Sequence, residues 1–217
     1  MKSKLFLAAT IGSIVTSQAA LTTGLVNYYN FDNLSNDAAA SGSNATISGA
    51  AAVGQAGGVF GNAATFTGAE GQLINTSDGF GTGSTALGES FTVTAWYKLD
   101  TDASTASTSR FFVFEGATDY YVSYGLRDFN AVNATGQSYT RDGRPPKEQE
   151  YVNIHTAGVW QHALITVTAL AGTSTIETYI DGASVGTLTA NTTALEDTGF
   201  NIGNARDSEP KRAMDGM

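Results

Sequence analysis

The side chains that could do acid–base chemistry are few in this chain. It contains two histidines, His155 and His162, and no cysteine. Glu148 and Glu150 lie two residues apart, after a Pro-Pro step in a segment that we expect to be a loop. A glycosidase needs two carboxylates at a set separation, and neither this pair nor any serine, zinc or nucleotide motif provides a comparable set. The sequence therefore predicts a protein without catalytic residues.

Aromatic side chains gather around the expected loop at residues 127–150. A flat ring can stack on the C–H face of a sugar, while nearby Asn, Asp and Arg side chains bond its hydroxyls. Tyrosine is also an ordinary strand residue, so a role in core packing stays open. We expect the two tryptophans, Trp96 and Trp160, to pack rather than bind. The predicted ligand-binding residues are Tyr121, Tyr124, Tyr139 and Tyr151.

Short strands separated by turn-rich connections must position these residues. A second turn-rich segment, 78–88, is expected to be another long surface loop. In the run 91–99, apolar and polar residues alternate, which indicates a strand with one buried face. The predicted strands are 25–31, 44–48, 64–67, 71–75, 91–99, 110–115, 120–126, 151–155, 160–167, 175–180, 183–188 and 200–203.

The clearest local signal is the pair of strands around Asp181-Gly182. Asp-Gly between two strand-like runs predicts a tight hairpin, because the turn needs positive φ angles that glycine adopts without a Cβ clash. Many short strands joined in this way, without helical periodicity, predict an all-β fold. We expect one two-sheet antiparallel jelly-roll sandwich.

The first nineteen residues have the features of a secretory signal peptide. Lys2 and Lys4 precede an apolar run at 5–15, and Ser17-Gln18-Ala19 provides small residues for cleavage after Ala19. A buried N-terminal helix is the alternative. We expect residues 1–19 to be removed and residues 20–217 to form one domain, secreted or held at the cell surface, that does not insert into a membrane.

The charge balance narrows the range of partners. Eleven basic and 20 acidic residues give a net charge of −9. Such a surface repels the phosphates of nucleic acid, so nucleic acid is excluded as an expected partner. An exported chain without cysteine has no disulfide to stabilise it, which favours a bacterial origin.

Six segments occur in an order and spacing that resemble a known family. They are 25–32, ending in Phe31-Asp32; 40–44; 61–68; 90–99, which contains Trp96; 160–162; and 179–182. Together they resemble the laminin-G-like jelly-roll domains of the concanavalin A-like superfamily. The resemblance implies a jelly-roll fold from about residue 25 onward and a structural role for His162.

The resemblance also implies a calcium ion. Members of this superfamily often bind Ca²⁺ near the opening Phe-Asp and the closing acidic strand, which correspond here to Asp32 and Asp215. Carboxylates and loop carbonyls are the ligands that Ca²⁺ prefers. Alternatively, Asp32 ends a strand and bonds a turn. The family continues beyond the point matched by Asp215, so we expect this chain to lack the last strand, which would pair beside 25–31.

Three functions stay open at this stage. The first is an exported, non-catalytic recognition module that binds a glycan or an extracellular protein. The second is a glycoside hydrolase or lyase, or an accessory domain of a polysaccharide-degrading enzyme. The third is a structural envelope protein.

Overall fold

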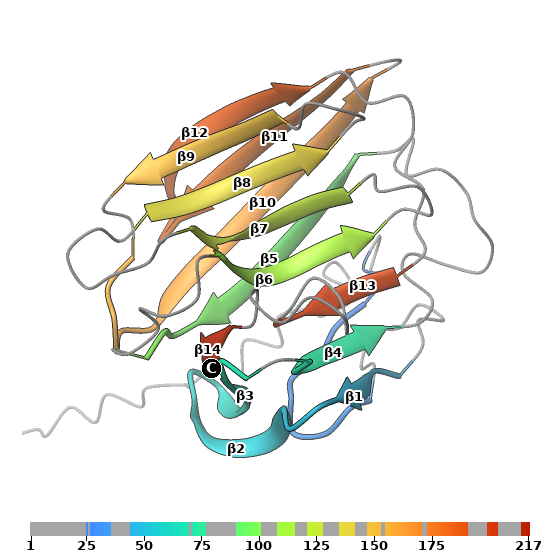
Figure 1. Ribbon diagram of the computed structural model, residues 1–217, viewed down its shortest axis with the longest axis vertical. Helices are drawn as coiled ribbons and strands as arrows, with labels where there is room; N and C mark the ends of the chain where they lie inside the picture. Colours follow the sequence, from blue (N-terminus) through green and yellow to red (C-terminus); the bar gives the residue numbers. More distant parts are fainter. Residues whose placement is uncertain are drawn as a thin grey trace, which may run out of the picture.

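The computed structural model describes residues 25, 27–35, 44–69, 71–76, 90–100, 108–115, 121–127, 135–141, 147–152, 155–170, 173–190, 199–203 and 214–217. Every regular element in these ranges is a β-strand (Figure 1). None of them contains a helix long and apolar enough to cross a membrane. The predicted signal peptide at 1–19 and the predicted loop at 78–88 lie outside these ranges.

The described residues form the strands β1 to β14 in chain order. Their bounds are β1 (Thr46–Ser48), β2 (Ala52–Gly58), β3 (Gly61–Thr67), β4 (Leu73–Thr76), β5 (Phe91–Tyr97), β6 (Thr108–Glu115), β7 (Tyr121–Arg127), β8 (Thr135–Arg141), β9 (Lys147–Val152), β10 (Gln161–Leu170), β11 (Thr173–Ile180), β12 (Ala183–Ala190), β13 (Gly199–Ile202) and β14 (Asp215–Gly216).

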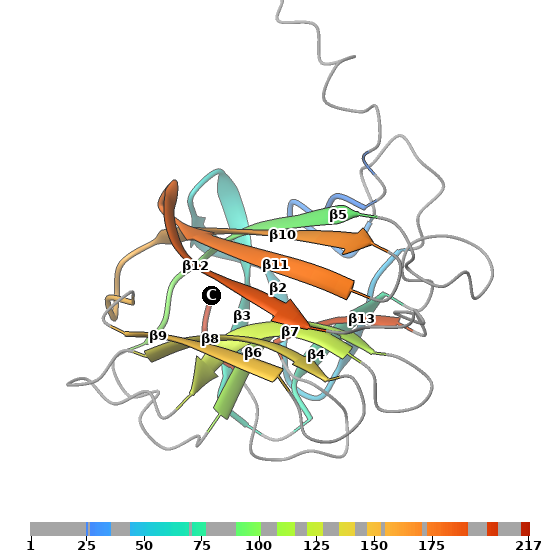
Figure 2. The ribbon, with the colours of Figure 1, turned by 90° about the horizontal axis from the view of Figure 1, so that it is seen from above.

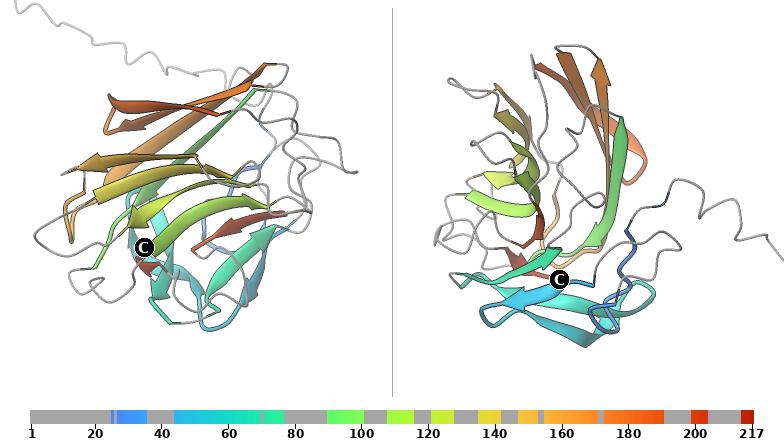
Figure 3. Two further views of the ribbon diagram at one scale, coloured as in Figure 1. Left: turned by 45° about the horizontal axis from the view of Figure 1, so that its top comes forward. Right: turned by 90° about the vertical axis from the view of Figure 1, so that its right-hand side faces the viewer.

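Two antiparallel sheets form the layers of a sandwich (Figure 2). The seven-stranded sheet has the order β1-β4-β13-β6-β7-β8-β9, and the four-stranded sheet has the order β12-β11-β10-β5. A three-stranded sheet, β14-β3-β2, lies at one end of the sandwich (Figure 3). This arrangement confirms the predicted all-β sandwich.

The core lies between the layers and follows the period of two expected for strands. On β5 and just beyond it, Tyr97 and Leu99 are buried, while Phe91, Val93 and Ala95 are partly buried against the same cluster. The alternation predicted for 91–99 is therefore confirmed. The other buried aliphatic residues of the four-stranded sheet are Ala163, Ile165, Val167, Ile176, Ile180 and Leu188.

The two layers meet along β9 and β12, which lie side by side. The Tyr151 hydroxyl on β9 donates a hydrogen bond of 3.1 Å to Thr178 Oγ1 on β11. A Cβ atom on Gly186 of β12 would approach Tyr151 Cε1 to 2.5 Å. Only glycine leaves room for the tyrosine ring at this point.

The predicted hairpin between β11 and β12 is present, and it is tied to β10. Both turn residues have positive φ, 50° at Asp181 and 80° at Gly182, as a type I′ turn requires. The Asp181 carboxylate accepts hydrogen bonds from His162 N at 2.8 Å and from Gln161 Nε2 at 3.3 Å. The backbone N of Asp181 also donates to the His162 carbonyl at 2.8 Å. The Asp-Gly turn thus fixes the start of β10.

The prediction of a strand at 25–31 is wrong for the residues that the structure describes there. Positions 25 and 27–30 are irregular, and Phe31 has a φ of 61°. The side chain of Asn30 accepts a hydrogen bond from Asp32 N at 2.9 Å, and that of Asn33 accepts one from Ser35 N at 2.6 Å. Such local asparagine turns offer the backbone an alternative to a ladder.

The predicted loop at 127–150 is also wrong, because it contains β8 and most of β9. Glu148 and Glu150 therefore lie on a strand, two residues apart and on one face. The Pro-Pro step, which ends just before β9, favours a loop more strongly than the polar residues after it favour a strand. The strand β2 is a further difference from the prediction, because its glycines weaken the strand signal.

The last described residues join two of the sheets. Asp215 and Gly216 pair with Thr67 and Phe66 of β3. Met217 and Lys98, at the end of β5, exchange two backbone hydrogen bonds of 2.7 and 2.8 Å. The expectation of a missing last strand stays a prediction.

Substitutions at Asp181 test how strongly the hairpin stabilises the fold. We expect Asp181→Ala to lower the free energy of unfolding by about 2–4 kcal/mol, because it removes two hydrogen bonds and places alanine at positive φ. Asp181→Gly keeps the favourable φ and should lose less, and Asp181→Asn should lose least. Urea denaturation of the four proteins gives the comparison. Equal midpoints for wild type and Asp181→Ala would contradict this role.

Candidate ligand-binding surface

Two large aromatic side chains are exposed to solvent on one side of the molecule. Phe60 is 81% exposed and lies in the two-residue turn between β2 and β3. Trp96 is 44% exposed and occupies an outward position on β5. Exposed rings of this size contribute little to the core, so they indicate a surface available for contact.

The rings lie close enough to act together. The centroids of Phe60 and Trp96 are 6.3 Å apart, with the ring planes at 77°. The centroids of Trp96 and His162 are 5.0 Å apart. This distance follows from strand pairing, because Trp96 and His162 are direct partners across β5 and β10.

The His162 ring is held on its strand by a second contact. A hydrogen bond of 2.6 Å joins His162 Nε2 to Thr94 Oγ1, two residues before Trp96. The backbone of His162 is fixed by Asp181 on both its N–H and its carbonyl side. The ring next to Trp96 is therefore preorganised, as the predicted structural role of His162 implies.

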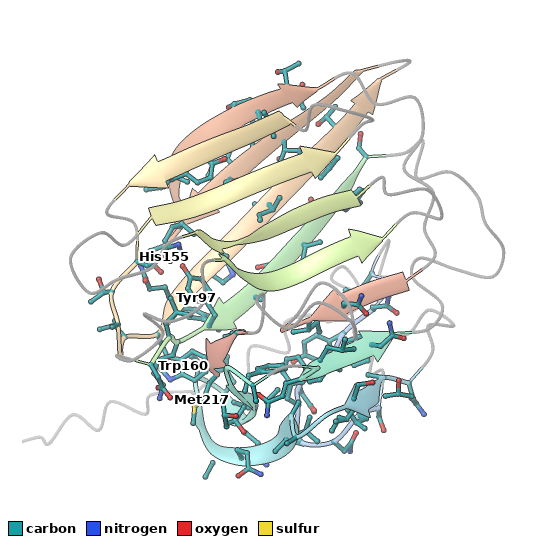
Figure 4. All side chains as sticks on the ribbon, in the orientation of Figure 1. Tyr97, His155, Trp160 and Met217 are labelled. Carbon is teal, nitrogen blue, oxygen red and sulfur yellow. The ribbon has the colours of Figure 1, made fainter. Side chains whose placement is uncertain are left out.

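Trp160 secures the hairpin that carries Phe60. Its indole Nε1 donates a hydrogen bond of 3.2 Å to the Gly57 carbonyl on β2. Lys98 Nζ lies 5.3 Å from the centroid of the same indole, a cation–π distance (Figure 4 labels Trp160). Trp160 thus packs, as predicted, and its contacts hold the turn against the four-stranded sheet. We call Phe60, Trp96, Trp160 and His162 the aromatic surface.

The four tyrosines predicted to bind ligand do not share one face. Tyr151 is 4% exposed, so its ring packs in the interior instead of forming an exposed stacking surface. Strand register places position 124 on the same face of the seven-stranded sheet as Tyr151, and positions 121 and 139 on the opposite face. Ligand binding by Tyr121, Tyr124 and Tyr139 stays a prediction.

The two aspartates predicted to bind calcium lie at opposite ends of β3. A Cβ atom on Gly61, where β3 begins, would lie 3.7 Å from Asp32 Oδ1. Asp215 pairs with Thr67, where β3 ends. Six residue steps of β3 separate these two contacts along the strand.

No group of three His, Asp or Glu side chains within the described ranges is arranged to hold a metal. Calcium binding, at either aspartate or elsewhere, stays a prediction.

The buried residue His155 lies beside Tyr97, the last residue of β5 (Figure 4). A hydrogen bond of 2.6 Å joins His155 Nδ1 to the Tyr97 hydroxyl, and both residues are buried. Burial lowers the pKa of His155 from 6.5 to about 3, and the charge of Asp181 opposes this shift only in part. The residue is neutral at physiological pH and acts in packing.

Comparisons with known proteins agree with this architecture. The family described as the concanavalin A-like lectin/glucanases superfamily matches residues 71–217, and the chain belongs to this laminin-G-like family. The match begins after the family-like segments at 25–32 and 61–68. A search of curated protein sequences gave no match.

Two solved structures show the same fold. Domain 4 of an extracellular GH43 arabinanase from Geobacillus stearothermophilus, in complex with arabinotriose, is 20% identical and has a TM-score of 0.61. That likeness covers 88% of this chain and 87% of the other. The binding domain of botulinum neurotoxin serotype D is 14% identical, with a TM-score of 0.55, over 78% of this chain and 40% of the other. Identities this low establish the fold alone.

The expectation that Trp96 packs in the same way as Trp160 is wrong, because its side chain is 44% exposed. Two features of the sequence indicate the exposure of the aromatic surface. Trp96 shares the polar face of its strand with Thr92 and Thr94, so it had to point away from the core. Phe60 lies two residues after Gly58 and directly before Gly61. Glycines at this spacing are typical of a tight turn, where side chains project outward.

The pH dependence of stability tests the burial of His155. Between pH 6.5 and about 3 the unfolded chain binds a proton at this residue and the folded chain does not. The free energy of unfolding must therefore fall as the pH is lowered through this window, by up to about 1.4 kcal/mol per pH unit from this group. We expect the stability difference between wild type and His155→Gln to narrow from pH 7 to pH 4 in denaturant titrations.

Thr46→Ala is the control for this experiment, because it changes an exposed side chain that has no ionisable group. Its stability should run parallel to that of the wild type over the same pH range. Parallel curves for wild type and His155→Gln would instead show that His155 is not held neutral by the fold.

Proposed function

We propose that this domain is a non-catalytic glycan-binding module whose ligand contacts the aromatic surface. The observation that carries the proposal is the exposed pair Phe60 and Trp96 on a concanavalin A-like fold. The arabinanase domain of the same fold, which was solved with arabinotriose, supports a carbohydrate as the class of ligand. The predicted signal peptide supports a role outside the cell.

The chemistry of the surface suits a sugar. The faces of Phe60 and Trp96 can contact sugar C–H groups, and the Trp96 ring is kept in place by its neighbours Phe60 and His162. Thr94 and Lys98, at outward positions on either side of Trp96, offer groups that hydrogen-bond to hydroxyls. Preorganised rings lose little conformational entropy when a ligand binds.

Aromatic substitutions test the proposal directly. The full chain should bind at least one polysaccharide in glycan arrays and pull-down assays, with and without calcium. We expect Trp96→Ala and Phe60→Ala each to weaken that binding about tenfold, which corresponds to about 1.4 kcal/mol, because each removes a stacking face. Trp96→Phe should retain much of the affinity, and Phe60→Leu should behave like Phe60→Ala.

Thr46→Ala, on β1 of the other sheet, is the control and should bind like the wild type. If Trp96→Ala and Phe60→Ala bind as tightly as the wild type, the ligand binds elsewhere on the protein. An absence of glycan binding under both calcium conditions would refute the proposed function. Ordered self-association in that case would favour a structural envelope protein.

The enzymatic alternative has one specific observation in its favour. Glu148 and Glu150 share one face of β9, which is the edge strand of the seven-stranded sheet. We nevertheless expect no turnover of a polysaccharide panel, and we expect the Glu148→Gln/Glu150→Gln variant to bind glycan like the wild type. Reducing-end assays measure the turnover, and pull-down assays measure the glycan binding of the double variant. Turnover that disappears in the double variant would establish an enzyme.

A further inference from the structure

We infer that the ligand is a neutral linear polysaccharide and that it lies across the outer face of the four-stranded sheet, from the aromatic surface to Tyr179. This inference rests on the proposed function and extends its site from one end of the sheet to a second ring.

Strand register defines the outer face. Because Val93, Ile165 and Ile176 face the core, the alternate positions on the same strands face solvent. Cross-strand pairing arranges these outward positions in two rows. One row is Thr94, Leu164, Tyr179 and Ser184, and the next is Thr92, Thr166, Glu177 and Thr187.

The face is open to a ligand along both rows. Thr92, Thr94, Ser184 and Thr187 are exposed, and the positions between them on β10 and β11 are half-buried. Hydroxyl groups therefore line both edges of the sheet. Each hydroxyl can donate one hydrogen bond and accept others, which matches the donors and acceptors of a sugar chain.

Trp96 and Tyr179 mark the two ends of the proposed binding path across the outer face of the sheet. Trp96 on β5 pairs with His162 on β10. Tyr179 on β11 pairs with Leu164, which lies two residues further along β10. Two strand spacings and two residue steps separate Trp96 from Tyr179, which corresponds to about 12 Å. One sugar ring cannot contact both side chains, whereas a chain of several sugars can.

The Tyr179 ring is held in position and its hydroxyl stays neutral. The hydroxyl donates a hydrogen bond of 3.1 Å to Glu177 Oε2 on the same strand. This hydrogen bond and the charge of Glu177 raise the pKa of Tyr179 above its usual value of 10.0. Tyr179 therefore presents a fixed, uncharged ring to the ligand.

The charge of the face favours a neutral ligand. Among the outward positions of the four strands that the structure describes, Glu177 carries the one carboxylate. Lys98, just beyond β5, lies over the Trp160 ring. An acidic polysaccharide would be repelled by Glu177 and by the net charge of −9, whereas a neutral chain meets no such penalty.

A length series of oligosaccharides tests the inference. The probes are neutral arabino-, xylo-, gluco- and manno-oligosaccharides of two to eight units, with polygalacturonate as the acidic comparison, measured by calorimetry on the full chain. We expect the affinity for one neutral series to rise over several units and then to level off. Tyr179→Ala should weaken binding of the longest members about tenfold and leave the shortest unchanged, whereas Trp96→Ala should weaken both.

Tyr179→Phe is the matched comparison, because it keeps the ring and loses only the bond to Glu177. It should retain most of the affinity for the longest members that Tyr179→Ala loses. Leu164→Arg is a second variant that obstructs the path between the two rings, and it should also weaken only the longer members. Its use keeps the test decisive if Tyr179→Ala does not fold.

The possible outcomes separate this inference from the proposed function. If Trp96→Ala weakens binding while Tyr179→Ala and Leu164→Arg do not, the glycan site stands and the extended path is wrong. Tighter binding of polygalacturonate than of any neutral series would also overturn the inference. If no oligosaccharide or polysaccharide binds, the proposed function fails and this inference fails with it.

Discussion

The register between β5, β10 and β11 determines which side chains of the four-stranded sheet form the core and which face solvent. Successive strand residues face opposite sides of a sheet, so a shift of one residue would turn Trp96 and His162 into the core and Ile165 into solvent. Burial of aliphatic side chains opposes such a shift, since each fully buried Ile or Val contributes about 1.5–3 kcal/mol. The Asp181 carboxylate adds a local restraint, because it binds Gln161 and the backbone of His162 where β10 begins. The same interactions that define the core therefore also define the outer face.

The aromatic surface is assembled from three separate parts of the chain. The turn between β2 and β3 supplies Phe60, β5 supplies Trp96, and the start of β10 supplies His162 and is preceded by Trp160. The hydrogen bond from Trp160 to Gly57 and the contact between Phe60 and Trp96 both place the β2–β3 turn against the four-stranded sheet. Lys98 connects this region to the end of the described chain through its backbone bonds with Met217. The position of the exposed rings thus depends on how two sheets meet.

Much of the fold was predictable from the sequence, because period-two alternation at 91–99 and the Asp-Gly turn are local signals with direct physical causes. The errors have local causes too. The aromatic run 25–31 suggested a strand, but Asn30 and Asn33 bond their own backbone instead. The sequences of β8 and β9 are rich in polar residues and flank a Pro-Pro step, which is a pattern typical of a loop. The candidate site was harder to predict. The contact between Phe60 and Trp96 and the burial of Tyr151 depend on which distant strands pack side by side, and no pattern within these segments specifies that packing.

The most direct measurement of the central claim is a backbone NMR titration of ¹⁵N-labelled protein with the glycan that binds best in the array. We expect the chemical-shift changes to concentrate at the β2–β3 turn and at outward positions of β5, β10 and β11, with the change of the Trp96 indole signal among the largest. Changes concentrated on β7 and β8, around Tyr121 and Tyr139, with an unaffected Trp96 indole, would contradict it.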